Sequence, residues 1–428
     1  MKNKKWLFIV AAIVLAGIAA YVFWSKEDET DRTDGKTVIQ ITTSGTNYEM
    51  DVFEEIAARF MKQHPEIEIE WIDIGNERNA KTLALIESGN PPDIFFLNDN
   101  VSYLASKGAL EPLDSLIEKD GSFDVSRFDT NYLEPQSVDG RLYALPIEVT
   151  PYVIYYNADL FKKYGVPLPQ DDWTQDEFYE AAKRLTIPEE SQYGFQTAYN
   201  WHSHQIGWLN RAGASLFKED LKTTALDSPE ALEALTFIYN MIVVDHISPD
   251  PAEQAAMGTT SWDVMFLNQK VAMTTACMWN LPGYKAMDLP FEWDVVKMPR
   301  NKNQDTKANL TLWAMSSSGR HKEEAWQFLS YMVGPEGMKI LAEAGYSTPG
   351  ARDEEADAVI RGISSPSNVE VFLDAAADIN LEEDKCPAKM EVVTILNNGI
   401  ERLMMGEITP KECQDDLVRE MNEVLKEY

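Results

Sequence analysis

Residues 38–71 read VIQITTSGTNYEMDVFEEIAARFMKQHPEIEIEW, and their hydrophobic pattern changes twice. Residues 38–41 (VIQI) are β-branched apart from Gln40, which is typical of a short strand. Across residues 52–61 the apolar side chains recur every three or four positions, which predicts one buried face of a helix. Pro65 ends that helix, and residues 67–71 alternate strictly between apolar and charged side chains, which predicts a half-buried strand. The order strand, helix, strand indicates an α/β fold.

A third strand and two polar loops extend this pattern. Residues 94–97 (IFFL) are a continuous apolar run, which suits a central parallel strand covered on both faces. Ligands bind at the carboxyl ends of the strands in an open α/β sheet, and polar residues follow the first and third strands here. Their hydroxyls, carboxamides and one carboxylate suit a neutral polyhydroxylated ligand, although the same residue types also cap helices and form turns. The candidate ligand-binding residues in these loops are Thr43, Ser44, Asn47, Asn98 and Asp99.

Composition narrows the range of functions. The chain has 428 residues, which favours two or three domains, and its 70 Asp and Glu against 38 Lys and Arg give a net charge of −32. So acidic a chain repels phosphate backbones, which argues against nucleic-acid binding, and it disfavours an anionic ligand. The three cysteines, Cys277, Cys386 and Cys413, lack the spacing of a structural metal site. Three buried free thiols are the favoured interpretation, with one disulfide and one free thiol as the alternative.

The N-terminal residues are predicted to lie outside the folded part. Lys2, Lys4 and Lys5 precede residues 6–24, which carry no charge and would rise about 28 Å as a helix. We expect residues 1–24 to be a transmembrane anchor, with a signal segment cleaved near Ala20 as the alternative. Residues 25–36 then form a charged tether. The folded part is expected on the extracellular side of the cytoplasmic membrane, or secreted if cleavage occurs.

Several short blocks follow one another in a recognisable order. Residues 87–94 read ESGNPPDI, residues 139–146 read DGRLYALP and residues 155–161 read YYNADLF; residues 270–273 (KVAM), Trp279 and residues 322–326 (KEEAW) come later. Each block alone is weakly specific. Their order and spacing over residues 37–428 resemble the extracellular solute-binding proteins of family 1, the maltose-binding-like substrate receptors of sugar ABC transporters. The chain departs from Gram-positive members at Ile18, where a lipobox cysteine would stand, so an apolar anchor would replace the lipid.

This resemblance implies an α/β, two-lobed periplasmic-binding-protein-like fold with interwoven lobes, hinge crossovers and a central ligand cleft. By position, lobe one would take residues 37–147 and 308–365, and lobe two would take residues 148–307 and 366–428. The crossovers are expected near residues 148–150, near Asn309 and in the 360s. Closure around a ligand would be a hinge motion.

The resemblance also implies a site and its partners. Sugars present apolar C–H faces to indole rings, so Trp279 is expected to form a stacking wall of the cleft. For Trp201, a place in the cleft and a place in the core are equally supported. Core packing is the stronger expectation for Trp208, Trp262 and Trp313. The crossover residues expected to reach ligand hydroxyls are Glu148, Tyr152 and Asn309. The implied partners are a neutral mono- or oligosaccharide and the permease subunits of an ABC transporter, with no cofactor and no metal, and we expect a monomer.

The sequence supports an enzyme less well than a binding protein. No Walker loop, G-x-S-x-G or H-E-x-x-H motif occurs in the sequence, and His202 and His204 lack a third metal ligand at a definable spacing. Two carboxylates facing each other in a cleft would suffice for a polysaccharide-cleaving enzyme, which therefore stays as an alternative to the non-enzymatic receptor. A tethered sugar sensor that presents its ligand to a signalling partner is a third interpretation.

Overall fold

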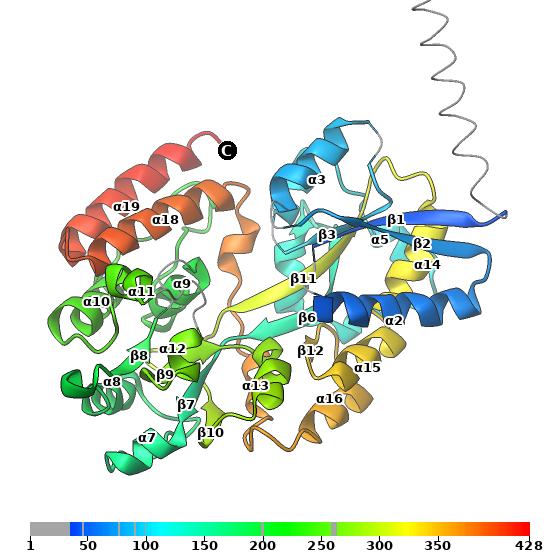
Figure 1. The fold of residues 1–428 in the computed structure, drawn as a ribbon. Helices are drawn as coiled ribbons and strands as arrows, with labels where there is room; N and C mark the ends of the chain where they lie inside the picture. The colour runs from blue at the N-terminus through cyan, green and yellow to red at the C-terminus, as the bar shows by residue number, and fades with distance from the viewer. Residues whose placement is uncertain are drawn as a thin grey trace, which may run out of the picture.

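The computed structural model describes residues 35–44, 47–75, 78–89, 91–98, 100–197, 201–257 and 263–428, without the side chains of residues 47, 48, 78 and 79. The predicted anchor, residues 25–34 of the tether, Asp99 and Trp262 lie outside this range. The described chain forms two α/β lobes, each built around its own sheet (Figure 1). Within the described residues, no helix is long and apolar enough to cross a membrane.

The first lobe contains a six-stranded sheet of order β12-β6-β11-β3-β1-β2. β1 pairs in parallel with β2 from Thr37↔Ile67 to Thr43↔Asp73, and with β3, while β11 runs antiparallel to both β3 and β6. The predicted strand, helix, strand order is therefore confirmed. The strands are β1 (Thr37–Thr43), β2 (Ile67–Asp73), β3 (Ile94–Leu97), β6 (Ala144–Pro151), β11 (Ala308–Met315) and β12 (Thr348–Pro349), and β4 (Ser137–Val138) and β5 (Arg141–Leu142) form a separate hairpin.

Helices cover this sheet and bury an aromatic core. The predicted apolar face of α2 (Asn47–Gln63) packs inward, and Phe53 meets the fully buried Trp313 edge-on with 5.3 Å between ring centroids. Phe96 approaches the same indole from β3 at 5.3 Å, so Trp313 belongs to the core, as expected. The other helices of this lobe are α3 (Arg78–Glu87), α4 (Val101–Ser106), α5 (Asp114–Lys119), α6 (Thr130–Leu133), α14 (Lys322–Met332), α15 (Pro335–Ala344) and α16 (Glu354–Arg361).

The second lobe contains a four-stranded sheet of order β10-β7-β9-β8, made of β7 (Val153–Asn157), β8 (Tyr193–Gln196), β9 (Val271–Ala276) and β10 (Trp293–Val296). The helices are α7 (Ala158–Lys163), α8 (Gln175–Arg184), α9 (His202–Arg211), α10 (Pro229–Tyr239), α11 (Pro251–Ala256), α12 (Val264–Leu267), α13 (Leu281–Met287), α18 (Lys389–Met404) and α19 (Pro410–Leu425). Helices α8 and α19 begin at capping boxes, which Thr174 forms with Glu177 and Thr409 forms with Glu412.

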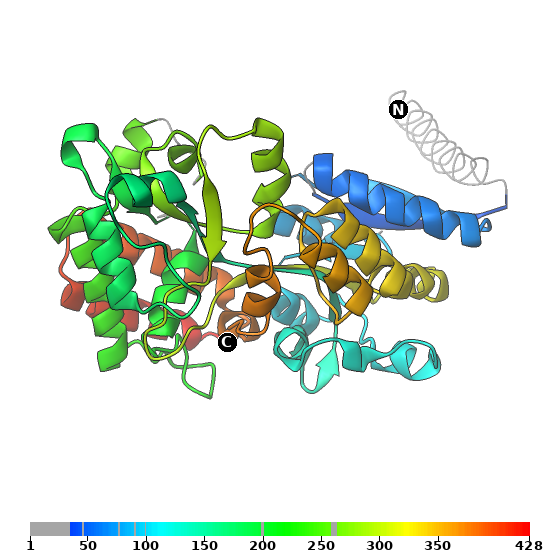
Figure 2. The ribbon, with the colours of Figure 1, turned by 90° about the horizontal axis from the view of Figure 1, so that it is seen from below.

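The chain passes between the lobes in segments that are hydrogen-bonded to one another. The first runs from β6 to β7, the second from β10 to β11, and the third contains α17 (Val371–Ala376) and the 3-10 turn η6 (Glu382–Lys385). The Tyr152 amide donates to the Lys307 carbonyl at 2.9 Å, and the Thr306 amide donates to the Asp378 carbonyl at 3.0 Å. Seen from below, the lobes are separate masses joined by these segments (Figure 2), which is the interwoven arrangement that was predicted.

All three cysteines are buried and free, which agrees with the favoured interpretation of the sequence. Cys277 directly follows β9, Cys386 directly follows η6, and Cys413 lies on α19. Burial raises the pKa of each thiol, to about 11 for Cys386 and to about 12 for Cys413, so none of them is a reactive thiolate at neutral pH.

Candidate functional site

A cavity of about 840 Å³ lies between the two lobes. Its volume is within the range of about 300–1,000 Å³ that is usual for small-molecule sites. The six-stranded lobe contributes its wall from α2, β6, β11 and the ends of β3 and α15, and the four-stranded lobe contributes the start of α9, the turn after β9 and α13. The third connection supplies a charged floor. The lining residues are Glu49, Asn98, Glu148, Trp201, His202, Ser203, Trp279, Pro282, Gly283, Ala286, Ala308, Asn309, Leu310, Thr311, Tyr346, Glu383, Asp384 and Lys389.

Five of the ten residues predicted from the sequence line this cavity: Asn98, Glu148, Trp201, Trp279 and Asn309. They come from distant parts of the chain, and β3, β6 and β11 bring three of them to one sheet. The Asn98 amide donates to the Leu310 carbonyl at 3.2 Å, and the Asn309 amide donates to the Tyr152 hydroxyl at 2.8 Å. These bonds fix the orientation of both carboxamides at the wall of the cavity.

The other predicted residues lie elsewhere. Thr43 and Ser44 end β1 as buried residues and do not line the cavity; the Thr43 hydroxyl approaches the Met50 sulfur at 2.8 Å. Tyr152 also lies behind the wall, because its hydroxyl accepts the Asn309 amide and its ring meets His204 edge-on at 4.8 Å. Tyr152 thus positions Asn309 from behind. Asn47 is the first residue of α2, but its side chain is not among the described atoms. Asp99 lies wholly outside the described residues.

Two indoles form the aromatic part of the cavity. Trp279 lies in the 3-10 turn η5 (Met278–Asn280), two residues beyond the buried Cys277 that follows β9, and the Asn280 amide anchors this turn to the Asp263 carboxylate at 3.2 Å. Trp201 directly precedes α9. Both are half-buried, unlike Trp208, which packs in the core with Phe178 and beneath the Arg211 guanidinium. The four-stranded lobe therefore supplies flat apolar surface at the cleft.

The opposite wall is acidic. Glu148 on β6 is 4% exposed, and the Thr311 hydroxyl donates to its Oε1 at 2.5 Å. Burial and the negative charge of Glu49 raise the pKa of Glu148 to about 8, against the opposing effect of the hydroxyls of Thr311 and Ser347. A carboxyl with such a pKa is mostly protonated at pH 7.

The floor of the cavity is also charged, but its charges are paired. Lys307 forms an ion pair with Glu383, and their side chains are 2% and 4% exposed, respectively. Lys389, at the start of α18, forms an ion pair with Asp384. Further along η6, Lys385 binds Glu134 of the six-stranded lobe at 2.9 Å. The turn η6 is therefore held to both lobes while two of its carboxylates face the cavity.

Sequence reasoning found Glu148 on the acidic wall but missed Glu49 and the floor. The polar loop after the first strand was read as far as Asn47, two residues short of Glu49. The floor was missed because residues 382–389 (EEDKCPAK) carry only a run of charges, which usually indicates a solvated surface. The order of acids and lysines in that run, downstream of the crossover predicted in the 360s, was the available signal.

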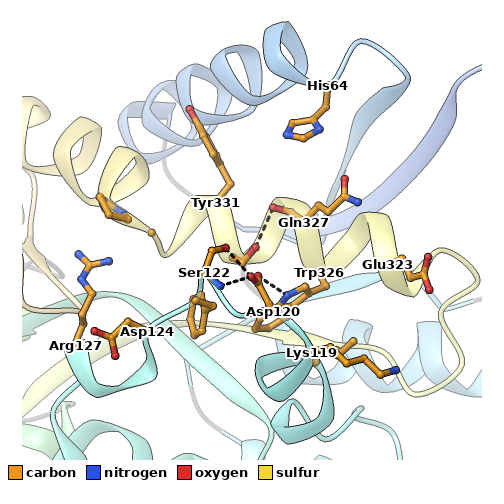
Figure 3. A pocket seen from close by; sticks show the side chains of 15 residues that line it. His64, Lys119, Asp120, Ser122, Asp124, Arg127, Glu323, Trp326, Gln327 and Tyr331 are labelled. Carbon is orange, nitrogen blue, oxygen red and sulfur yellow. Dashed lines mark hydrogen bonds between the residues drawn. The ribbon is translucent and has the colours of Figure 1, made fainter.

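A second hollow of about 710 Å³ lies on the outer side of the six-stranded lobe, between α5, α14 and the end of α2 (Figure 3). Its polar groups serve local structure: the Asp120 carboxylate accepts hydrogen bonds from the Ser122 hydroxyl at 2.6 Å and from the Trp326 indole at 3.0 Å. The Ser122 bond is the main reason that the pKa of Asp120 is lowered. The hollow belongs to a single lobe, and the interlobe cavity is the better candidate site.

The close histidine pair of the sequence is divided, because His202 lines the cavity and His204 lies behind its wall beside Tyr152. The described residues contain no group of three side chains that could hold a metal ion. Burial, and then the charge of Arg211, lower the pKa of His204 to about 3, so this imidazole stays neutral across the physiological range. The arrangement of indoles, carboxamides and hydroxyls around one cavity is suited to holding a polar organic molecule by stacking and hydrogen bonds.

Comparisons with known proteins agree with this geometry. The model of the bacterial extracellular solute-binding protein family matches residues 44–339. Maltotriose-binding protein of Pyrococcus abyssi is 26% identical over 308 residues, which are 70% of this chain and 63% of that protein. Multiple sugar-binding protein of Streptococcus mutans is 21% identical over 352 residues, which are 78% of this chain and 80% of that protein.

Solved structures show the same architecture. An ABC substrate-binding protein from Listeria monocytogenes, in complex with cycloalternan, is 27% identical and superposes with a TM-score of 0.82 over 91% of this chain and 99% of that one. The sugar-binding protein MalE of Xanthomonas citri is 19% identical, with a TM-score of 0.78 over 91% of this chain and 98% of that one. The predicted two-lobed periplasmic-binding-protein-like fold is confirmed.

Proposed function

Because the chain belongs to the bacterial extracellular solute-binding proteins, a family with sugar-binding ABC transporter members, we propose that it captures a neutral carbohydrate between its lobes and delivers it to an ABC importer. The observation that carries this proposal is the interlobe cavity, with Trp201 and Trp279 on one side and Asn98, Asn309 and Glu148 on the other. We take lobe one as residues 37–147 and 308–365, and lobe two as residues 148–307 and 366–428. Residues 148–151 are the crossover and complete β6 of the six-stranded sheet, so Glu148 stands on the wall of lobe one. The protein acts as a monomeric receptor without catalysis.

The charges around the cavity support a neutral ligand. Its lining contains one lysine and no arginine within the described residues, and that lysine, Lys389, is bound to Asp384. The buried Lys307 behind the floor is bound to Glu383. A phosphate or carboxylate ligand would therefore find no uncommitted cation there, and such ligands are normally held by arginine or lysine.

The connections between the lobes support capture by closure. The peptide groups of residues 152, 306 and 307 are hydrogen-bonded to one another or to the third connection, and so form a narrow joint behind the cavity. A ligand that touches both walls gains contacts only in the shut state, so its binding shifts the population toward closure. The closed surface of both lobes would then be the feature that permease subunits recognise.

A thermal-shift screen tests the proposed ligand class. Maltotriose, cycloalternan, tagatose and mannitol would be compared with glucose 6-phosphate and glucuronate. A ligand that binds only the folded state raises the melting temperature, and we expect this from one or more neutral compounds and not from the anions. A shift produced by the anions alone would refute the proposal.

A second candidate function is hydrolysis of a saccharide, for which Glu49 and Glu148 are the neighbouring pair of acids at the cavity. Glycosidases place an acid and a base or nucleophile on either side of the scissile bond. Incubation of the protein with oligosaccharides, followed by an assay for reducing ends, separates the two functions. The receptor leaves the number of reducing ends unchanged, and a hydrolase increases it.

For the N-terminal segment we propose that residues 6–24 remain attached and span the membrane, so that the lobes stand on its extracellular side. The support is the uncharged run between Trp6 and Trp24 and the absence of a lipobox cysteine at Ile18. Intact-mass analysis of membrane-extracted protein tests this. We expect a mass that includes residues 6–24, and a mature chain beginning near Ala20 would mean cleavage.

A further inference from the structure

We propose that Glu148 enters the closed cleft as a neutral carboxylic acid, and that its O–H group donates a hydrogen bond to an acceptor oxygen of the saccharide. Saccharide binding is then coupled to proton binding at one named residue. This inference rests on the proposed function for the identity of the ligand, but its protonation part can be tested on the ligand-free protein.

One oxygen of Glu148 is buried without a protein partner. Its Oε1 accepts the Thr311 hydroxyl at 2.5 Å, while Oε2 is buried and has no partner with hydrogen-bonding geometry among the described residues. The Ser347 hydroxyl is also close enough to favour the ionised form, but its effect is smaller than those of burial and Glu49. The side chain of Glu148 lines the interlobe cavity and is 4% exposed. Burial has removed the hydrogen bonds that Oε2 would make with water, and a ligand bound in the cavity can supply one in their place.

The groups that face Glu148 keep a proton on it. Glu49 approaches from α2 and disfavours a second negative charge. The buried Cys277 thiol approaches from the end of β9, and the charge of Glu148 in turn helps to raise the pKa of that thiol. Tyr346 precedes β12, and the remaining ionisable groups of the cavity are His202, Glu383, Asp384 and Lys389.

No described cation contributes to the ionisation of Glu148. The lysines of the region are bound to Glu383 and Asp384. Burial is the largest cause of the raised pKa of Glu148, and the charge of Glu49 is the second, which together bring it to about 8. Neighbouring carboxylates without a counter-cation hold a proton in the same way in aspartic proteases.

Protonation gives Glu148 a hydrogen-bond donor, whereas the ionised side chain would offer a ligand only acceptors. A protonated carboxyl has one O–H donor, and sugar ring and hydroxyl oxygens accept such bonds. If only the protonated form binds, the dissociation constant is flat below pH 8 and rises about tenfold for each pH unit above it. Saccharide binding above pH 8 then takes up protons from the buffer.

The binding experiment uses maltotriose and cycloalternan as probes, titrated calorimetrically from pH 6 to pH 9.5 in buffers of different ionisation heat. The wild-type protein should show the rise above pH 8 together with proton uptake. Glu148→Gln keeps a donor that cannot titrate, so its affinity at pH 7 should stay within about threefold of wild type and should not fall with pH. A wild-type affinity that is independent of pH, or an equally steep fall in Glu148→Gln, would overturn the proposal.

The ligand-free experiment is an infrared difference spectrum of wild type minus Glu148→Gln. A carbonyl band of a protonated carboxyl should be present at pH 7 and vanish as the pH rises through about 8. Glu49→Gln should move this loss to lower pH, because a neighbouring negative charge has been removed. Glu370→Gln, at an exposed ion pair with Arg361, is the matched control and should show no such band.

The two experiments fail differently. A band without binding of any saccharide would refute the proposed ligand class and leave the protonated Glu148 in place. Binding without the band would support the receptor and refute the protonated acid.

Discussion

The floor and the acidic wall of the cleft use the same residue types in opposite ways. Glu383 and Asp384 on the floor each have a lysine partner, and both ion pairs are largely buried. Glu148 on the wall has a second carboxylate, Glu49, where a cation would be expected. An acid with a lysine partner forms an ion pair that holds neighbouring segments together, whereas burial beside another acid favours the protonated form of a carboxyl. The comparison suggests that the floor serves the joint between the lobes and that the wall serves the ligand.

The largest effect is expected from breaking a floor pair. Lys307→Met leaves Glu383 buried without its cation, which should lower the free energy of unfolding by about 3–5 kcal/mol. Urea denaturation measures this. The double variant Lys307→Met/Glu383→Leu removes both charges and should recover much of the loss, because the uncompensated charge is the main cost.

Lys339→Met is the control for this prediction. Lys339 pairs with Glu355 on the surface, where the side chains are 42% and 77% exposed, so its loss should not change the urea midpoint measurably. Equal midpoints for Lys307→Met and Lys339→Met would mean that the buried pair does not hold the joint.

The second prediction concerns the aromatic wall opposite Glu148. Trp279→Ala should weaken saccharide binding by about 2–4 kcal/mol and leave the urea midpoint close to wild type, because a half-buried indole at the cavity contributes stacking surface. Trp313→Ala is the matched comparison, since that indole is fully buried in the core and its loss should cost about 3–5 kcal/mol of stability. A large drop in the urea midpoint of Trp279→Ala, with near-normal affinity in the folded fraction, would mean that Trp279 packs in the core and does not bind the ligand.

The third prediction concerns the effect of pH on the wall. The pKa of Glu148 is about 8 in the folded protein, above its value in the unfolded chain, so its contribution to stability is complete below the unfolded pKa and is lost as pH rises toward 8. Between pH 6 and pH 8 the free energy of unfolding of wild type should fall relative to Glu148→Gln by about 2 kcal/mol. Urea titrations of both proteins at several pH values measure this, and parallel curves would mean that Glu148 is ionised in the fold.

The contrast between wall and floor also marks what the sequence could reveal. Local periodicity was sufficient for β1, α2 and β2, because a buried face has a period that can be read from neighbouring residues. Order and spacing of blocks placed Trp279 at the cavity, since the preceding strand fixes where the turn after it lies. The same reasoning placed Thr43 and Ser44 at the strand end but could not tell that they would be buried beneath the wall.

Pairing of charges was beyond the reach of the sequence. Lys307 and Glu383 are 76 residues apart, and they meet only because the second and third connections run side by side. Glu49 and Glu148, which are 99 residues apart, likewise come within electrostatic reach of each other only in the folded chain. Whether an acid has a cation or another acid as its neighbour is a property of the tertiary fold, so the sequence alone could not distinguish the floor from the wall.

The smallest effect is expected from salt. If the floor charges are neutralised by their own lysines and Glu148 is protonated, a neutral saccharide meets no unscreened charge in the cleft. Raising NaCl from about 0.05 to about 0.5 M at pH 7 shortens the Debye length from about 14 to about 4 Å and should still change the dissociation constant by less than about twofold. A steep loss of affinity with salt in the wild-type protein would instead require a charged ligand, and the wall would then have to be ionised when that ligand binds.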